Sequence, residues 1–370
     1  GMAMIWVLGV LLGLCVIVIA GGMMLRAGGG LSRFEGDVDP QGWESFGNPD
    51  GPSPEHRAVE ISIKSMRPEI EGLSHGGMMQ FARKFMADVS RGKEFDCEFV
   101  PVEANGVPCE WVLAPGADPD RRVLYLHGGA FFAGSPEGHR TATSHFSRAI
   151  KASVLSVDYR LIPENQRREG IEDCKTAYRW ILGNGPQGEG APEHLFVGGD
   201  SAGGNLSLVI SNWTRDEGLR KPDAVVALSP LTDSTYSAPS LDSNMETDTM
   251  LGPLFGKLAK VPRFLLAWLY LYENRIKPNN PQVSPLMADL SDLPPTLVQV
   301  SESEMLYDDA RRFVNKARAA GSPVRLQSWP GLVHVWQWYC SEVPEADDAW
   351  DKVSEFIESV ERQERSPTSG

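Results

Sequence analysis

GGDSAGGNLSL, at residues 198–208, is the stretch that decides the fold, because it sets Ser201 among four glycines after the apolar run LFV. Glycine-rich turns between a strand and a helix serve two chemistries: they bind phosphate through backbone N–H groups, or they expose a serine nucleophile. The lysine of a phosphate-binding G-x-x-x-x-G-K-[ST] loop is missing here, and the glycines lack the G-x-G-x-x-G spacing of dinucleotide-binding turns. The pattern that fits is G-x-S-x-G, which spans residues 199–203.

The G-x-S-x-G pattern predicts an exposed serine hydroxyl when a strand precedes it and a helix follows it. Small residues on both sides of Ser201 let neighbouring backbones pass closely, and the helix N-terminus favours negative charge that develops at the serine. Many unrelated serines match the pattern by chance, and the alternative interpretation is an ordinary turn at a helix start. Three other segments of the chain therefore decide between the two interpretations.

The first of these segments is the loop YLHGGAFFAGS (125–135), which follows an expected strand and contains two adjacent glycines. Backbone N–H groups in such a loop can donate to the negatively charged oxygen that forms during acyl transfer. We expect the N–H groups of Gly128 and Gly129 to form this oxyanion hole, with the N–H of Ala202 as the third donor.

The other two segments supply the partners that a serine nucleophile needs. SESEMLYDDA (301–310) follows a strand and carries carboxylates, and WPGLVHVWQ (329–337) follows the last strand and carries His334. Serine, acid and histidine thus follow one another in the chain order of an α/β-hydrolase. This order predicts Ser201 as the nucleophile and His334 as the general base.

Three carboxylates compete for the role of the acid that orients the histidine. Glu304 is expected to hold it, because it lies just after the strand TLVQVS (296–301), where it can meet the imidazole. Asp308 is the rival, but it lies about one helical turn further along the chain, where its charge would equally stabilise a helix start. Glu302 is the third candidate, although within the strand it would face a different way.

The rest of the chain alternates strand-like and helix-like segments. Eight strand-like runs are expected at residues 98–102, 107–114, 122–128, 153–159, 194–200, 224–230, 296–301 and 324–330. Helix-like segments that separate most of them are expected at residues 140–150, 171–182, 202–215, 305–320 and 345–362. This alternation predicts an α/β class fold with a mostly parallel, eight-stranded sheet and helices on both faces.

A helical cap is expected where the alternation breaks. More than sixty residues separate the runs AVVALSP and TLVQVS, far more than an ordinary loop contains, and we place a cap insertion at about residues 240–285. Its expected helix at 260–275 carries Phe264, Trp268 and Tyr272 at four-residue spacing. Such an aromatic stripe usually packs in a core.

The N-terminus is expected to anchor the chain in a membrane. Met2 to Leu25 include no charged side chain, and a bilayer core needs about 20 apolar residues. A cleaved signal peptide is the alternative, but it would have a basic start and a shorter apolar run. The spacing of Gly9 and Gly13 allows close helix packing, which leaves a homodimer open, and the flanking charges do not indicate the side of the membrane. The expected organisation is an anchor at 1–30, a linker with N-terminal cap helices at 31–95, and a catalytic domain at 96–370.

Composition excludes several classes of function. The 370 residues include 49 acidic and 35 basic side chains, for a formal net charge of −14. This balance argues against binding to nucleic acid, which requires a basic face. The five cysteines form no C-x-x-C pair, so we expect no metal site, and the motifs imply no cofactor.

Five segments together carry a family resemblance: HGGAF (127–131), DYRLIPE (158–164), GDSAGG (199–204), SPLMADLSDLPPTLVQVSESEMLYDDARR (284–312) and GLVHVWQ (331–337). Over residues 95–365 they resemble the hormone-sensitive-lipase-like family of α/β-hydrolase esterases. The chain departs from that family at Ala130, where glycine is more frequent, and at Glu304, where aspartate is more frequent. The family's acid lies two residues before a leucine, a spacing that Glu304 keeps.

The resemblance implies a serine carboxylesterase that hydrolyses short-chain or aryl carboxylic esters with a Ser-His-acid triad. It implies a small-molecule ester as substrate. The alternative is a non-catalytic ligand-binding protein on the same fold. Such relatives tend to lose the serine or the histidine, and both are present in this chain, so the sequence favours the enzyme.

Overall fold

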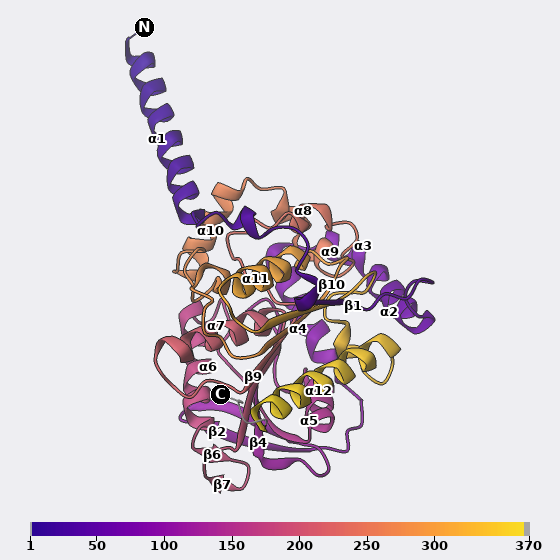
Figure 1. The fold of residues 1–370 in the computed structure, drawn as a ribbon. Coiled ribbons are helices and arrows are strands. Elements are labelled where there is room, and N and C mark those ends of the chain that lie inside the picture. Colours follow the sequence, from indigo (N-terminus) through magenta and orange to yellow (C-terminus); the bar gives the residue numbers. More distant parts are fainter. Residues whose placement is uncertain (1, 366–370) are drawn as a thin grey trace.

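The computed structural model describes residues 2–365, and a nine-stranded sheet forms its centre (Figure 1). The strands of this sheet are β1 (Trp43–Ser45), β2 (Glu98–Ala104), β3 (Val107–Leu113), β4 (Asp118–Leu126), β5 (Ala152–Val157), β8 (His194–Asp200), β9 (Ala224–Leu228), β10 (Thr296–Ser301) and β11 (Val324–Trp329). They lie in the order β1-β11-β10-β9-β8-β4-β5-β3-β2, and only the β5–β3 and β3–β2 pairs are antiparallel. The short strands β6 (Asn184–Gly185) and β7 (Gly188–Glu189) form a separate hairpin.

Helices cover the sheet on both faces and at one end (Figure 1). They are α1 (Met2–Arg26), α2 (Pro54–Ser65), α3 (Arg67–Glu71), α4 (His75–Asp88), α5 (Arg140–Ile150), α6 (Arg167–Ile181), α7 (Ala202–Asp216), α8 (Ser240–Ser243), α9 (Leu251–Ala259), α10 (Arg263–Asn274), α11 (Tyr307–Ala319) and α12 (Pro344–Arg365). Four short 3₁₀ helices lie at Leu31–Phe34, Pro40–Gly42, Pro285–Met287 and Trp336–Tyr339. The predicted α/β class with a mostly parallel sheet is confirmed.

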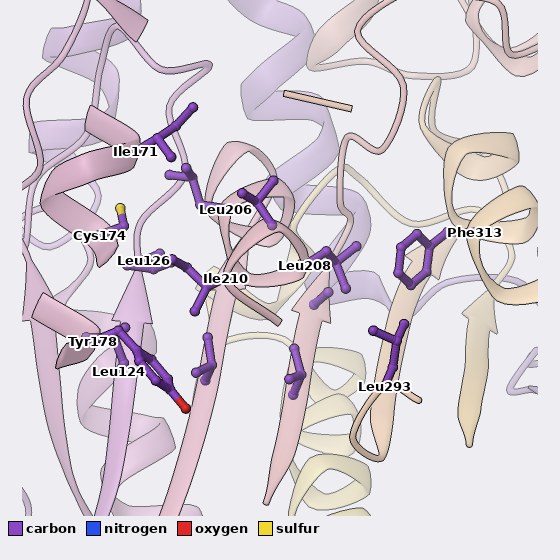
Figure 2. Close-up of a cluster of buried hydrophobic side chains, with 14 of the residues drawn as sticks. Leu124, Leu126, Ile171, Cys174, Tyr178, Leu206, Leu208, Ile210, Leu293 and Phe313 are labelled. Carbon is purple, nitrogen blue, oxygen red and sulfur yellow. The ribbon is translucent and has the colours of Figure 1, made fainter. Parts of the chain in front are cut away.

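Alternate residues of each central strand enter opposite layers of the core, because side chains alternate across a strand. In β4, Leu124 and Leu126 pack toward α6 and α7, within the cluster drawn in Figure 2. Val123 and Tyr125 of the same strand pack toward α5 and α12 on the other face. A strand that is buried on both sides is mostly apolar, which explains the near-continuous apolar runs in the sequence.

The sheet has one strand more than the eight predicted. β1 pairs in parallel with β11 at the sheet edge and lies inside the segment expected to begin as a linker. The indole Nε1 of Trp43 donates to Ser328 Oγ at 2.9 Å, and Glu35, a few residues earlier, forms an ion pair with Arg312 of α11. Residues 31–45 therefore form an ordered strap along the body, which a three-residue strand is too short to reveal in a sequence pattern.

Helix α1 extends away from the body of the molecule, and its C-terminal part lies beside α10 (Figure 1). It is the one helix within residues 2–365 that is long and apolar enough to cross a membrane. A membrane anchor and a signal sequence both satisfy that criterion. At its base, Trp268 Nε1 of α10 donates to the carbonyl of Val18 at 2.8 Å.

Candidate active site

Ser201 lies at a strained turn between β8 and α7. Its φ and ψ are 53° and −114°, a combination rarely adopted by residues other than glycine. The turn is held by the Ser201 N–H, which donates to the carbonyl of Leu228 at 2.7 Å. A Cβ on Gly199 or Gly203 would collide with the backbone of Leu126 on the neighbouring strand. The glycines of the motif are therefore required by close backbone approach, as the sequence predicts.

The structure brings Ser201, His334 and Glu304 into one hydrogen-bonded chain. His334 Nε2 lies 2.9 Å from Ser201 Oγ, and His334 Nδ1 lies 3.1 Å from Glu304 Oε1. Glu304 is fully buried and His334 is almost so. The three residues meet because each follows the carboxyl end of a parallel strand, and those ends lie at the same edge of the sheet.

Glu304 is held on its other side as well. Its Oε2 accepts hydrogen bonds from Ser229 Oγ at 2.8 Å and from the Ser301 N–H at 3.1 Å. Burial lowers the pKa of His334, but the charge of Glu304 and the hydrogen bond to it outweigh burial, and the net pKa is raised. This arrangement favours an imidazole that accepts a proton from the serine side.

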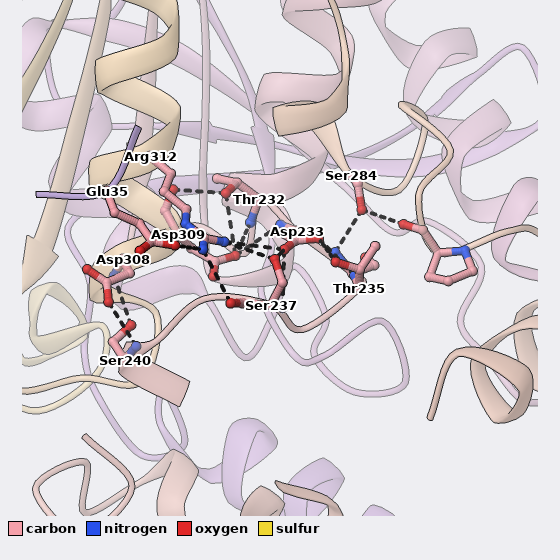
Figure 3. Close-up of polar contacts among 12 residues, drawn as sticks. Glu35, Thr232, Asp233, Thr235, Ser237, Ser240, Ser284, Asp308, Asp309 and Arg312 are labelled. Atoms are coloured by element: carbon pink, nitrogen blue, oxygen red, sulfur yellow. Dashed lines mark hydrogen bonds and ion pairs between the residues drawn. The ribbon is translucent and has the colours of Figure 1, made fainter. Parts of the chain in front are cut away.

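Asp308, the rival acid, faces another part of the molecule (Figure 3). Its Oδ2 accepts from the Ser240 N–H at 2.8 Å, and its Oδ1 pairs with Arg311 in the same helix. Glu302, the third candidate, accepts from Ser328 Oγ at 2.8 Å. Both carboxylates thus bind other groups, and Glu304 is the carboxylate that contacts His334.

The loop that carries Gly128 and Gly129 packs directly against the serine turn. A Cβ on Gly128 would lie 2.8 Å from the carbonyl oxygen of Asp200, and a Cβ on Gly129, whose φ is 124°, would collide with Ala133. Ala202 is the first residue of α7, where the helix dipole also places partial positive charge. Gly128 therefore lies against the residue before Ser201, and Ala202 directly follows Ser201.

A buried polar cluster supports this loop from below. The hydroxyl of Tyr159 donates to the carbonyl of His127 at 2.6 Å, and the two rings stack with centroids 4.2 Å apart. Burial lowers the pKa of His127 to about 3, so this imidazole stays neutral. Asp200 accepts from Tyr125 Oη at 2.6 Å and from Trp338 Nε1 at 3.2 Å. These residues position the backbone and do not reach the serine hydroxyl.

Three positioning residues were not predicted from the sequence. Asp248, in the segment expected to form the cap, accepts from the Met305 N–H at 2.9 Å, directly after Glu304, and burial raises the pKa of Asp248 to about 6. Asn244 donates to the carbonyl of Glu304 at 2.9 Å. His56 of α2 accepts from the Val333 N–H at 3.0 Å, next to His334. Each comes from a segment without strand periodicity, so no sequence pattern connects it to the site.

Proteins with similar sequences include hydrolases and esterases. Residues 123–338 match a family described as having the alpha/beta hydrolase fold. The chain is 35% identical to an acetyl-hydrolase of Streptomyces hygroscopicus over 68% of this chain and 79% of that protein. It is 33% identical to an esterase of Acinetobacter venetianus over 70% of this chain and 82% of that protein.

Solved structures show the same similarity. An esterase/lipase from an uncultured bacterium superposes with a TM-score of 0.72 and 34% identity, over 83% of this chain and 99% of that chain. A hormone-sensitive lipase from a metagenome library superposes with a TM-score of 0.71 and 29% identity, over 84% of this chain and 99% of that chain.

Within residues 2–365, no group of His, Cys, Asp and Glu side chains has an arrangement that could hold a metal ion.

Proposed function

Because the chain belongs to the α/β-hydrolase family and is an ester hydrolase of its hormone-sensitive-lipase-like group, we propose that Ser201, His334 and Glu304 are its catalytic triad. The observation that carries this proposal is the continuous hydrogen-bonded chain from Ser201 Oγ through both nitrogens of His334 to Glu304. Glu304 is buried, and Ser229 and Ser301 hold its second oxygen by two further hydrogen bonds. A carboxylate fixed in this way has the properties of a group that orients an imidazole.

In the proposed mechanism Ser201 Oγ attacks the acyl carbon of the ester, and His334 Nε2 takes the hydroxyl proton. The tetrahedral oxyanion accepts hydrogen bonds from the N–H groups of Gly128, Gly129 and Ala202. His334 then protonates the leaving alcohol, which leaves an acyl group on Ser201. Water, deprotonated by the same imidazole, releases the carboxylic acid and restores the serine.

The substrates we propose are short-chain or aryl carboxylic esters. The support comes from the N-terminal cap helices, which are hydrogen-bonded to the loop at 125–135 and to the segment after β5. Arg83 of α4 donates to the carbonyls of Phe132 at 2.7 Å and Ile162 at 3.1 Å. Ser90, just after α4, donates to the carbonyl of Gly138 at 2.8 Å. A cap held by several hydrogen bonds leaves less freedom to open for a long acyl chain.

We expect kcat/KM to be higher for p-nitrophenyl butyrate than for p-nitrophenyl palmitate, because the fastened cap limits acyl length. The measurement is initial-rate hydrolysis by the purified full-length chain, with both esters below their solubility limits. Higher kcat/KM for the palmitate ester would contradict the short-chain proposal while leaving ester hydrolysis itself intact.

We propose further that α1 anchors the chain in a membrane. Full-length protein is expected to stay in the membrane fraction after a carbonate wash. A chain lacking residues 1–26 is expected to be released, because α1 is the one helix among residues 2–365 that is long and apolar enough to span a bilayer. Fractionation followed by mass spectrometry of the N-terminus measures this. Full-length protein in the soluble fraction would contradict the anchor, and a shortened N-terminus would identify a signal peptide.

A further inference from the structure

Helix α10 carries an apolar stripe on its outward side. Leu265, Trp268, Leu269 and Tyr272 are 40%, 38%, 40% and 67% exposed. Their spacing of three and four residues places them on one face, which we call the outer stripe. The inward side of the same helix is buried through Leu266, Ala267, Tyr270 and Asn274. A surface helix in water usually has a polar outer face, whereas this helix is apolar on both sides.

The outer stripe is continuous with the apolar surface of α1. Trp268 donates to the carbonyl of Val18, and its ring lies where a Cβ on Gly21 would be. A Cβ on Gly22 would collide with the backbone of Phe264, so the two helices are in close contact. Along α1 the described large apolar side chains from Met4 to Ile17 are more than half exposed.

The position of this contact along α1 matches the end of a membrane span. At 1.5 Å per residue the 25 residues of α1 measure about 37 Å, against about 30 Å for a bilayer core. Val18 and Gly21 lie in the last third of the helix, near the depth at which the core gives way to headgroups. Trp and Tyr side chains concentrate at that depth, and Trp268 and Tyr272 are the aromatic residues of the outer stripe.

The segment that carries the outer stripe is basic in an otherwise acidic protein. Residues 251–280 contain five basic side chains and one acidic side chain, Glu273, although the whole chain carries a formal charge of −14. Lys257, Lys260, Arg275 and Lys277 are exposed. Arg275 lies over the ring of Tyr272, 4.9 Å from its centroid. Exposed basic residues in the same segment as an apolar stripe are the pattern that binds an anionic lipid surface.

We propose that the outer stripe of α10 inserts into the headgroup layer of an anionic bilayer and makes a second membrane contact beside α1. This inference rests on the proposed anchor and is independent of the proposed triad. The contact would fix α10 against the lipid surface, with exposed basic residues of this segment among the headgroups.

The test uses the full-length chain reconstituted into vesicles of phosphatidylcholine and phosphatidylglycerol. An environment-sensitive fluorophore is attached through Tyr272→Cys in a Cys15→Ser, Cys97→Ser background, since the other three cysteines are buried. Ile61→Cys in the same background is the matched control, because Ile61 and Tyr272 are both 67% exposed and Ile61 lies on α2. Leu265→Cys gives a second probe on the stripe, and native Cys15 labelled in the Cys97→Ser chain reports on α1.

We expect spin-labelled lipid to reduce the fluorescence of the probes at positions 272, 265 and 15 by about half or more, because an interfacial helix lies roughly 5–10 Å into the boundary. The probe at position 61 should be unaffected. Equal quenching at positions 272 and 61 would overturn the proposal. A blue shift at position 272 without lipid quenching would also overturn it, because a second copy of the chain would then cover the stripe.

Lack of quenching at position 15 would show that α1 does not lie in the bilayer. This result would overturn both the anchor and the second contact. Hydrolysis of p-nitrophenyl butyrate, measured on the same samples, keeps that result separate from the proposed triad. If ester hydrolysis fails while positions 15 and 272 are quenched, the membrane contact stands without the triad.

Discussion

Ser201→Ala is expected to reduce kcat for ester hydrolysis by about 10⁴-fold or more, the loss typical of a removed triad nucleophile. The fold should persist, because Ser201 Oγ contacts only His334 Nε2 among the hydrogen bonds of residues 2–365. Alanine also keeps a Cβ at the strained φ of 53°, so the backbone cost of the turn is unchanged. Steady-state hydrolysis of p-nitrophenyl butyrate and thermal unfolding measure the two expectations.

Ser211→Ala is the matched control for this substitution. Ser211 lies on the same helix α7, is buried, and its Oγ has no hydrogen-bond partner within the part of the chain that the structure describes. Its loss should leave kcat almost unchanged. Near-normal turnover by Ser201→Ala, with wild-type contamination excluded by titration with an irreversible serine reagent, would refute the nucleophile.

Glu304→Gln is expected to lower kcat/KM by about 10³-fold or more, whereas Asp308→Asn should cost little, because Glu304, and not Asp308, is hydrogen-bonded to the imidazole. A neutral amide at position 304 cannot stabilise the imidazolium that forms when His334 takes the proton. Measurement of kcat/KM near neutral pH for both folded variants decides between the two acids. A large loss in Asp308→Asn with little loss in Glu304→Gln would move the acid to Asp308.

The pH profile gives the same comparison a second readout. The general base must be neutral, so activity falls as pH drops through the pKa of His334, which lies above its usual value of 6.5. Glu304 is the main cause of that increase, so Glu304→Gln should shift the acid limb of kcat/KM to lower pH. In Asp308→Asn the limb should stay in place, because Asp308 does not contact His334.

The sequence predicted those parts of the molecule that strand periodicity controls. The eight expected strands are present, and the carboxyl ends of three of them carry Ser201, Glu304 and His334 to one edge of the sheet. Ser229 follows a fourth strand at that edge and could have been singled out by the same reasoning. The contacts of His56 and Asp248 depend on how irregular segments pack onto the body, and local pattern does not encode that packing.

The aromatic stripe at 260–275 shows a different limit. An aromatic stripe such as Phe264, Trp268 and Tyr272 more often packs in a core than binds a ligand, and we expected this segment to form a cap helix. The structure has a helix there but leaves Trp268 and Tyr272 exposed on its outer face. The expectation assumed water as the only solvent. An apolar face beside a helix that is itself apolar enough to cross a bilayer can contact lipid and need not pack in a core.

The ordered strap at residues 31–45 has a mechanical consequence for an anchored enzyme. A flexible tether of residues 27–42 would have a root-mean-square end-to-end distance of about 22 Å, and the catalytic domain could move over that range. Instead, Asn279 Nδ2 donates to the carbonyl of Ala27 at 2.9 Å and Asn315 Nδ2 to that of Phe34 at 3.0 Å, and β1 then joins the sheet. If α1 lies in a bilayer, these contacts restrict the motion of the domain relative to the membrane. The strap then sets the height and tilt of the domain above the lipid, and the domain rotates together with the embedded helix.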